Sequence, residues 1–308
     1  MNINLKLPDG FLDEEIRIDY MVSPKMKKVW AIQLDLLNEL KKVCEKHGLT
    51  YFADSGTLLG AIRHGGYIPW DDDIDIVMKR EDYNKLIEVG KQEFQNPYFL
   101  QSAHSEFFPR GYARLRNSDS TALTKNDLKV DINHGVFIDI FPLDKLPDDP
   151  VTRKIWLKEI YLLSRLISYG APRRIEAYKE ISKKTAIRLG KCIYPIFGYE
   201  ALVKQYEKLC GKYNGVETKE ISYVAYSHGK KKHIWDSRCF DSAQSVPFEF
   251  TEIMIPVGYD SRLRTEYQDY MKIVRANTAH GELILEPDIP YKEFMKDHSI
   301  HELMEQFI

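Results

Sequence analysis

Two aspartates at the entrance to an apolar run constrain this 308-residue chain more than any other feature. Asp73 and Asp75 alternate with isoleucines and lead into Val77, a β-branched sequence typical of a buried strand. Because side chains at i and i+2 of a strand point to the same face, we expect both carboxylates to project together while Ile74 and Ile76 enter a core. Adjacent carboxylates repel each other unless a cation lies between them. The pattern therefore predicts a site for a hard divalent cation, Mg²⁺ or alternatively Mn²⁺, that also contacts phosphate oxygens.

The same aspartates fit two interpretations that involve no phosphate chemistry. A run of aspartates is more often a solvated turn or the start of a helix, but here the acids alternate with isoleucine. A calcium loop of the EF-hand type starting at Asp71 would need glycine at its sixth position, where this chain has Ile76. An isolated Asp-x-Asp is a weak motif, so the neighbouring sequence decides between these interpretations.

A third acid lies inside a second apolar run. Val136 to Phe141 reads as a short strand with Asp139 between two isoleucines. A charge in the middle of an apolar strand costs several kcal/mol unless it is paired or bound to a metal, so Asp139 is a strong functional candidate. Asp144 follows Pro142, and we expect it in a loop as a solvated or helix-capping acid.

Three stretches of the chain together resemble the LicD family. These stretches are Asp54-Ser-Gly-Thr-Leu-Leu-Gly60, His64-Gly-Gly-Tyr-Ile-Pro-Trp-Asp-Asp-Asp-Ile-Asp75 and Phe137-Ile-Asp-Ile-Phe-Pro-Leu-Asp144. LicD proteins are phosphocholine transferases of bacterial surface glycans, and they are distant relatives of fukutin and fukutin-related protein, which transfer ribitol phosphate. The resemblance returns between Pro256 and Met271, where Gln268 replaces the usual glycine. That departure leaves the donor or acceptor preference open.

The resemblance implies a nucleotidyltransferase-like fold and a role for each motif. The Ser55-Gly56-Thr57 turn would bind a phosphate at the start of a helix, where backbone N–H groups and the helix dipole favour an anion. Asp73 and Asp75 would bind the metal. Asp139 would act either as a further metal ligand or as the base that accepts the proton of the acceptor hydroxyl.

The implied reaction moves phosphocholine from CDP-choline to a sugar hydroxyl, and CMP leaves. The acceptor would be a glycan or lipid-linked sugar precursor of teichoic acid or lipopolysaccharide. Related donors carry ribitol, glycerol or ethanolamine. We expect further substrate contacts from cationic and aromatic side chains near the motifs, since guanidinium groups match phosphate oxygens and aromatic rings surround quaternary ammonium groups. These candidates are Arg63, His64, Trp70, Tyr112, Arg114 and Arg116.

Two other function classes remain open at this point. Nucleotide-sugar glycosyltransferases of one large group also use Asp-x-Asp to bind a metal, and they would transfer the sugar instead. The Gly-Thr turn before the acids and Asp139 in its own strand argue against that class. An inactive binding module is disfavoured because all three acids, Asp73, Asp75 and Asp139, are present.

Composition indicates an ordinary cytoplasmic enzyme. The chain is 44% hydrophobic and 29% charged, which is typical of globular proteins. Its four cysteines lack Cys-x-x-Cys spacing, which excludes a recognisable zinc or redox motif and favours reduced thiols. We expect neither a signal peptide at the N-terminus nor a membrane-spanning segment, because no apolar run is long enough.

Hydrophobic periodicity predicts an α+β fold with a mixed sheet and helices. We divide the chain into a nucleotidyltransferase-like core (1–150), a basic helical insertion (151–214) and a C-terminal part that completes the core and the substrate cleft (215–308). A helix should follow the Ser23-Pro24 cap and end near Gly48. The expected strands and shorter helices of the core are strands 50–53, 73–78, 98–101, 112–116 and 136–141 and helices 56–63 and 81–94.

The helical insertion carries an unusual charge. Residues 151–214 contain 14 Lys and Arg but 5 acids, an excess of +9, although the whole chain has a net charge of −2. Such an excess usually marks a solvated helical face. The alternative is a patch that binds an anionic membrane surface, which would suit an enzyme acting on a lipid-linked sugar. Nucleic acid is not expected as a partner, because the chain as a whole is acidic and no nucleic-acid motif occurs.

Overall fold

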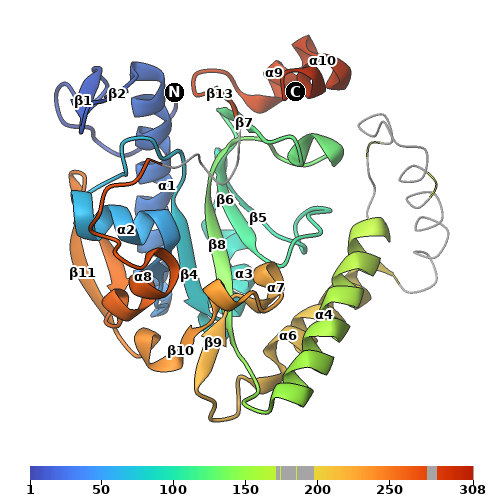
Figure 1. The fold of residues 1–308 in the computed structure, drawn as a ribbon. Helices are drawn as coiled ribbons and strands as arrows, with labels where there is room; N and C mark the ends of the chain where they lie inside the picture. The colour runs from blue at the N-terminus through green and yellow to red at the C-terminus, as the bar shows by residue number, and fades with distance from the viewer. Residues whose placement is uncertain (171–173, 175–184, 186–197, 276–282, 308) are drawn as a thin grey trace.

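The computed structural model describes residues 1–170, 174, 185, 198–275 and 283–307 (Figure 1). It is an α+β fold, as predicted. Part of the basic insertion lies outside the described residues. Of the four cysteines, the three that the structure describes are buried free thiols.

A seven-stranded mixed sheet forms the centre of the described part of the chain. Along its main path the order is β10 (Trp235–Asp236), β9 (Glu220–Ser222), β8 (Val136–Lys145), β4 (Asp75–Lys79) and β3 (Phe52–Ala53). β6 (Ala113–Asn117) pairs with the first half of β8 and with β5 (Tyr98–Gln101). The β4–β8 pair is parallel and the other pairs are antiparallel. β8 therefore contacts three neighbouring strands and is the axis of the fold (Figure 1).

Two helices of the core cover this sheet. α1 (Pro24–His47) begins at Ser23, whose hydroxyl accepts a hydrogen bond from Met26 N at 3.2 Å, and ends at Gly48 in the left-handed region (φ +65°), as the capping signals predict. α3 (Arg80–Glu93) follows β4 directly. Ile74 and Ile76 are fully buried in the core cluster that includes the α1 side chains, which confirms the predicted orientation of that segment.

The remaining elements surround this core. They are β1 (Glu15–Arg17), β2 (Tyr20–Val22), α2 (Ser55–His64), β7 (Thr121–Leu123), α4 (Pro150–Gly170), α6 (Tyr199–Cys210), α7 (Val224–Ser227), β11 (Ala243–Phe248), β12 (Thr251–Pro256), α8 (Tyr259–Tyr267), β13 (Ile284–Glu286), α9 (Tyr291–Asp297) and α10 (Ile300–Glu305). No helix in the described ranges has the length and apolar character needed to cross a membrane.

The C-terminal part and the insertion attach to the core differently. β9 and β10 extend the central sheet, and α8 contacts α2. α4 and α6 pack on each other through a separate apolar cluster that includes Trp156, Ile160 and Tyr206. The boundaries at 150 and 214 remain predictions.

The boundaries of the two strands that carry the acids differ from the predicted ones. β4 begins at Asp75, so Asp73 precedes the hydrogen-bonded ladder. β8 continues through Pro142 to Lys145. A proline fits there because pairing with β6 has ended at Ile140 and pairing with β9 starts only at Asp144, so no neighbour on that side needs its missing N–H.

The prediction that Asp144 is a solvated loop acid was wrong. Its carboxylate is completely buried in β8 and accepts hydrogen bonds from Arg80 Nε at 2.8 Å, Arg80 Nη2 at 2.5 Å and Asn214 Nδ2 at 2.9 Å. Arg80 is the first residue of α3, so the pair joins this helix to the sheet. The partner that makes burial possible is far away in sequence, and local patterning therefore missed it.

Replacing Asp144 tests how much the Arg80–Asp144 pair contributes to the stability of the fold. We expect Asp144→Asn to lower the free energy of unfolding by about 3–5 kcal/mol, because Arg80 would remain buried without its counter-charge. Urea unfolding followed by circular dichroism measures this. The exposed pair of Arg238 with Asp236 provides the control, since Asp236→Asn should leave the unfolding midpoint unchanged. Equal effects of both substitutions would contradict the assignment.

Candidate active site

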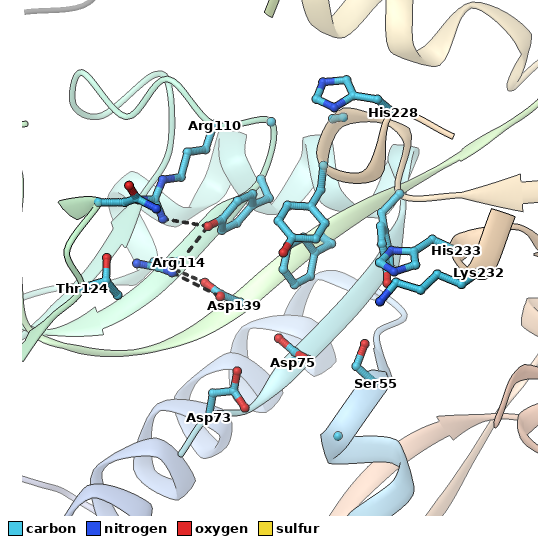
Figure 2. Close-up of a pocket in the computed structure, with 18 of the residues that line it drawn as sticks. Ser55, Asp73, Asp75, Arg110, Arg114, Thr124, Asp139, His228, Lys232 and His233 are labelled. Atoms are coloured by element: carbon cyan, nitrogen blue, oxygen red, sulfur yellow. Dashed lines mark hydrogen bonds and ion pairs between the residues drawn. The ribbon is translucent and has the colours of Figure 1, made fainter. Parts of the chain in front are cut away.

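Strand pairing brings three charged side chains into one row. Asp75 on β4 lies in register with Asp139 on β8, and Asp139 lies in register with Arg114 on β6. Partners in register on neighbouring strands point to the same face. Figure 2 shows the carboxylates of Asp73, Asp75 and Asp139 around one space. The predicted acids from two distant segments are thus assembled by the sheet itself.

Arg114 holds Asp139 in place. Arg114 Nε donates to Asp139 Oδ1 at 2.6 Å and Nη2 to Oδ2 at 3.4 Å (Figure 2). Arg114 Nη1 donates to Asp127 Oδ2 at 2.8 Å. The guanidinium lies 3.7 Å from the centre of the Phe137 ring. Burial would lower the pKa of Arg114, but Asp139 holds that pKa well above its usual range. The carboxylate of Asp139 is therefore oriented and paired before any substrate binds.

Asp127 is the centre of a buried charge network behind the site. It accepts hydrogen bonds from Arg110, Arg114 and Arg116. Burial alone would raise the pKa of Asp127, but the three arginines hold it well below its usual range. Burial, together with Arg114, lowers the pKa of Arg116 to about 10. The network contains three guanidinium groups and only two carboxylates, those of Asp127 and Asp139. It therefore carries a net positive charge next to the acids of the site.

The start of α2 supports the other side of the site. Ser55 occupies the left-handed region (φ 47°), a strained conformation for a residue other than glycine. Gly56 allows a close approach, because a Cβ there would lie 2.5 Å from Asp71 Oδ2. Thr57 Oγ1 accepts a hydrogen bond from Asp75 N at 2.8 Å. The Gly-Thr turn therefore packs against the acidic segment and fixes its backbone.

A buried ion pair connects this turn to the C-terminal part. The Asp54 carboxylate precedes α2 and accepts two hydrogen bonds of 2.7 Å from Arg262 on α8. Arg262 also donates to Glu266 and lies 3.9 Å from the centre of the Trp235 ring. A bidentate pair of this kind fixes orientation as well as distance. The C-terminal segment that resembles the family thus supports the N-terminal turn.

The carboxylates suit a hard cation. Within the described residues, Asp71, Asp72 and Asp73 form a group whose ligand oxygens all lie within 4.8 Å of one another. Burial, together with Asp73 and Asp72, raises the pKa of Asp71 well above its usual range. Carboxylate oxygens are the ligands that Mg²⁺ and Mn²⁺ prefer, so the donor set fits such an ion. The sequence had pointed to Asp73, Asp75 and Asp139, and it did not single out Asp71.

A cavity of about 1370 Å³ opens in front of the acids. The three acids Asp73, Asp75 and Asp139 line it. The lining also includes six predicted substrate contacts and Arg110, which was not predicted; the six are Ser55, Gly56, Arg63, Trp70, Tyr112 and Arg114. Arg63 Nη1 donates to Tyr270 O at 2.8 Å, which fixes the guanidinium at the rim. The volume is large enough for a nucleotide-linked donor together with part of an acceptor.

Aromatic rings form one wall of the cavity. Tyr112, Phe141, Tyr223 and Tyr226 all line it. The ring centroids of Tyr112 and Phe141 are 4.6 Å apart, those of Phe141 and Tyr226 are 5.0 Å apart, and those of Tyr223 and Tyr226 are 5.7 Å apart. We call these four residues the aromatic wall. Trp70 lies elsewhere on the lining and makes an edge contact with Tyr20.

Sequence reasoning missed a cationic and imidazole group on the C-terminal side. Lys232 and His233 line the cavity, and Figure 2 shows both on the Ser55 side of the view. His233 is buried, and neither ring nitrogen has a hydrogen-bond partner among the residues that the structure describes. Burial, together with Lys232, lowers the pKa of His233 to about 4. Local sequence patterning did not single out the basic run Lys230–His233, and only the fold brings Lys232 and His233 to the cavity that the acids line.

Three predicted substrate contacts do not line the cavity. The Thr57 hydroxyl is used by Asp75 N. His64 accepts a hydrogen bond from Arg63 Nε at 2.9 Å. Arg116 is buried in the sheet, where it donates to Gln101 Oε1 at 2.8 Å and to Gly135 O at 2.6 Å. Arg114 and Arg116 are therefore buried members of the charge network, and Arg116 does not line the cavity as a substrate contact would.

Comparison with known proteins finds similarity over the same region. Residues 48–161 match the model described as LicD/FKTN/FKRP, nucleotidyltransferase domain. The chain is 28% identical over 251 residues to the lipopolysaccharide cholinephosphotransferase LicD of Haemophilus influenzae, which covers 80% of this chain and 92% of the relative. It is 50% identical over 51 residues to the human ribitol 5-phosphate transferase FKRP, which covers 17% of this chain and 10% of the relative. The predicted resemblance to LicD is confirmed.

The contact between Thr57 and Asp75 can be tested without substrate. We expect Thr57→Val to lower the free energy of unfolding by about 1–3 kcal/mol, because Asp75 N would lose its acceptor in a buried site. Thr57→Ser keeps the oxygen and should retain most of the stability. Chemical denaturation of the three proteins measures the difference. A loss in Thr57→Ser that is as large as or larger than the loss in Thr57→Val would contradict a stabilising role of the hydrogen bond.

Proposed function

We propose that this chain, whose residues 48–161 carry the LicD-type nucleotidyltransferase domain, transfers a phosphocholine or related phospho-alcohol group to a hydroxyl of a glycan precursor. The observation that carries this proposal is the row of Asp75, Asp139 and Arg114 beside the start of α2, in a cavity with a cationic and an aromatic side. Phosphoryl transfer depends on positioning and on charge neutralisation more than on covalent chemistry, and this cavity offers both.

The acids would hold the metal. Asp73 and Asp75 are the proposed ligands of Mg²⁺ or Mn²⁺, with Asp71 and Asp139 close to them. When bound, such an ion would neutralise charge that develops on the phosphate oxygens of the donor. The arginines behind the acids limit the repulsion between the carboxylates and an anionic donor.

The chain's own groups would position the donor and the acceptor. Backbone N–H groups of Ser55 and Gly56, at the start of α2, would bind a donor phosphate. Lys232, which lines the cavity, would neutralise the leaving CMP. A sugar hydroxyl would attack the phosphorus that bears the alcohol, the bond from that phosphorus to the CMP oxygen would break, and the hydroxyl proton would pass to a carboxylate. Asp139 would either accept that proton or contact the metal, and its hydrogen bond from Arg114 supports a fixed orientation in both roles.

The donor we propose is CDP-choline. The aromatic wall provides the ring faces that a quaternary ammonium requires, and Tyr226 is exposed toward solvent within it. CDP-ribitol, CDP-glycerol and CDP-ethanolamine are the related donors to compare. The acceptor we propose is a sugar hydroxyl of a glycan or lipid-linked precursor, modified on the cytoplasmic side of the membrane.

Donor binding can be measured directly by calorimetry. We expect CDP-choline to bind in the presence of Mg²⁺ and to lose about tenfold or more in affinity without it. Asp75→Asn should abolish the effect of the metal, and Glu88→Gln, an exposed acid on α3, should not. Binding that is equal with and without metal, in the unaltered protein and in Asp75→Asn, would contradict the metal site.

The product of the reaction separates the two enzyme classes. With labelled donors, a phosphodiester on the sugar and released CMP support the proposal. A glycoside formed from a nucleotide sugar would instead identify a glycosyltransferase. Failure of CDP-choline together with success of another CDP-alcohol would retain the reaction and exclude choline.

The aromatic wall predicts a selective loss. We expect Tyr226→Ala to weaken CDP-choline binding by about 1 kcal/mol, or about fivefold, because a ring face at the ammonium is lost. CDP-ribitol has no cationic head group, so its binding should change less. Tyr226→Phe keeps the ring and is the matched control. Equal losses for both donors in Tyr226→Ala would place the alcohol away from the aromatic wall.

A further inference from the structure

One face of α4 exposes an apolar stripe. Val151, Ile155, Leu162 and Leu166 are between 36% and 67% exposed, and they fall within about 60° of one another on a helix of about 3.6 residues per turn. We call these four residues the α4 stripe. In Figure 1, α4 runs along the outer edge of the molecule. The four side chains are therefore aligned on one side of the helix, in two pairs separated by the exposed Lys158 and Glu159, and are not scattered over the surface.

The buried face of α4 packs against α6. Trp156, Ile160 and Ile167 are buried in the cluster with Leu202 and Tyr206 of α6. Trp156 Nε1 donates to Leu209 O at 2.7 Å. The α4 stripe lies on a different side of the helix and is not needed to hold α4 on the protein. Packing against α6 explains the buried apolar face of α4, but it does not explain the exposed one.

Cationic side chains lie between the α4 stripe and the cavity. Lys154, Lys158 and Arg165 project from the flank of α4 next to the stripe, as the helical period dictates. On the same flank, Tyr161, Ser164 and Arg165 line the cavity of the candidate active site. Passing around α4, the order is thus cavity, cations and apolar stripe.

We propose that α4 binds the surface of an anionic lipid bilayer. The stripe would enter the boundary between head groups and acyl chains, and Lys154 and Lys158 would contact the anionic head groups. This combination of a basic flank and an apolar face is the pattern of interfacial helices. The excess of +9 in residues 151–214 supports the choice of an anionic surface over a neutral one. The mouth of the cavity would then lie next to the membrane, where a lipid-linked acceptor is present.

This inference is independent of the proposed reaction and is tested by vesicle binding. The full chain is mixed with vesicles of phosphatidylglycerol and phosphatidylcholine, or of phosphatidylcholine alone, and the bound fraction is measured by flotation. We expect binding to the anionic vesicles, little binding to the neutral ones, and a loss of binding as salt is raised.

Matched variants distinguish binding through the α4 stripe from non-specific adsorption to the vesicles. Leu162→Glu should weaken vesicle binding by about tenfold or more, the fold-change for losing one leucine from an apolar phase. Val257→Glu makes a similar charge change at a comparably exposed residue, 49% against 56%, and should have no comparable effect. Lys158→Gln should reduce binding about fivefold, and Lys292→Gln, far along the chain, should not. Circular dichroism establishes that each variant is folded.

Three outcomes would overturn the proposal. The first is an absence of binding to anionic vesicles by the unaltered chain. The second is equal loss in Leu162→Glu and Val257→Glu. The third is concentration-dependent self-association, measured by analytical ultracentrifugation, that Leu162→Glu abolishes while vesicle binding persists, because the stripe would then be an interface between two copies.

Discussion

The parallel pairing of β4 with β8 is the constraint on which the rest of this structure depends. It sets Asp75 beside Asp139 at the face of the sheet that lines the cavity, where two carboxylates close together repel each other. The arrangement is stable because β6, on the far side of β8, supplies Arg114 to Asp139. A site built on strands is more rigid than one built on loops. The acids can therefore be oriented before a donor or a metal arrives.

Charge compensation extends well beyond the cavity. Asp127 is fully buried, and three arginines neutralise it. One of them, Arg114, also donates to Asp139 in the site. Asp54 and Arg262 repeat the same solution at the start of α2. Buried pairs of this kind add little net stability, but breaking one leaves an uncompensated charge. Their contribution is orientation, since each pair connects a segment near the site to a distant part of the chain.

The helical insertion contributes to two surfaces at once. One flank of α4 lines the cavity, and another carries the α4 stripe and its lysines. Because both belong to a single rigid helix, binding at the outer face would set the distance between the cavity and whatever lies beyond that face. Binding of the stripe to a bilayer would account for its exposure.

The sequence by itself determined the local elements and the acids. The capped helix after Ser23, the strand at 98–101, and the alternation around Ile74 and Ile76 all follow from short-range patterning, because caps, turns and periodicity act over a few residues. Only the tertiary structure decided which distant groups meet. Local patterning placed Asp144 in a loop, did not single out Lys232, and did not show that Arg116 is buried. The physical reason is that the burial of a charge is decided by its partner: Arg80 and Arg262 lie far along the chain from the carboxylates that they neutralise, and Asp127 meets Arg114 only through the fold.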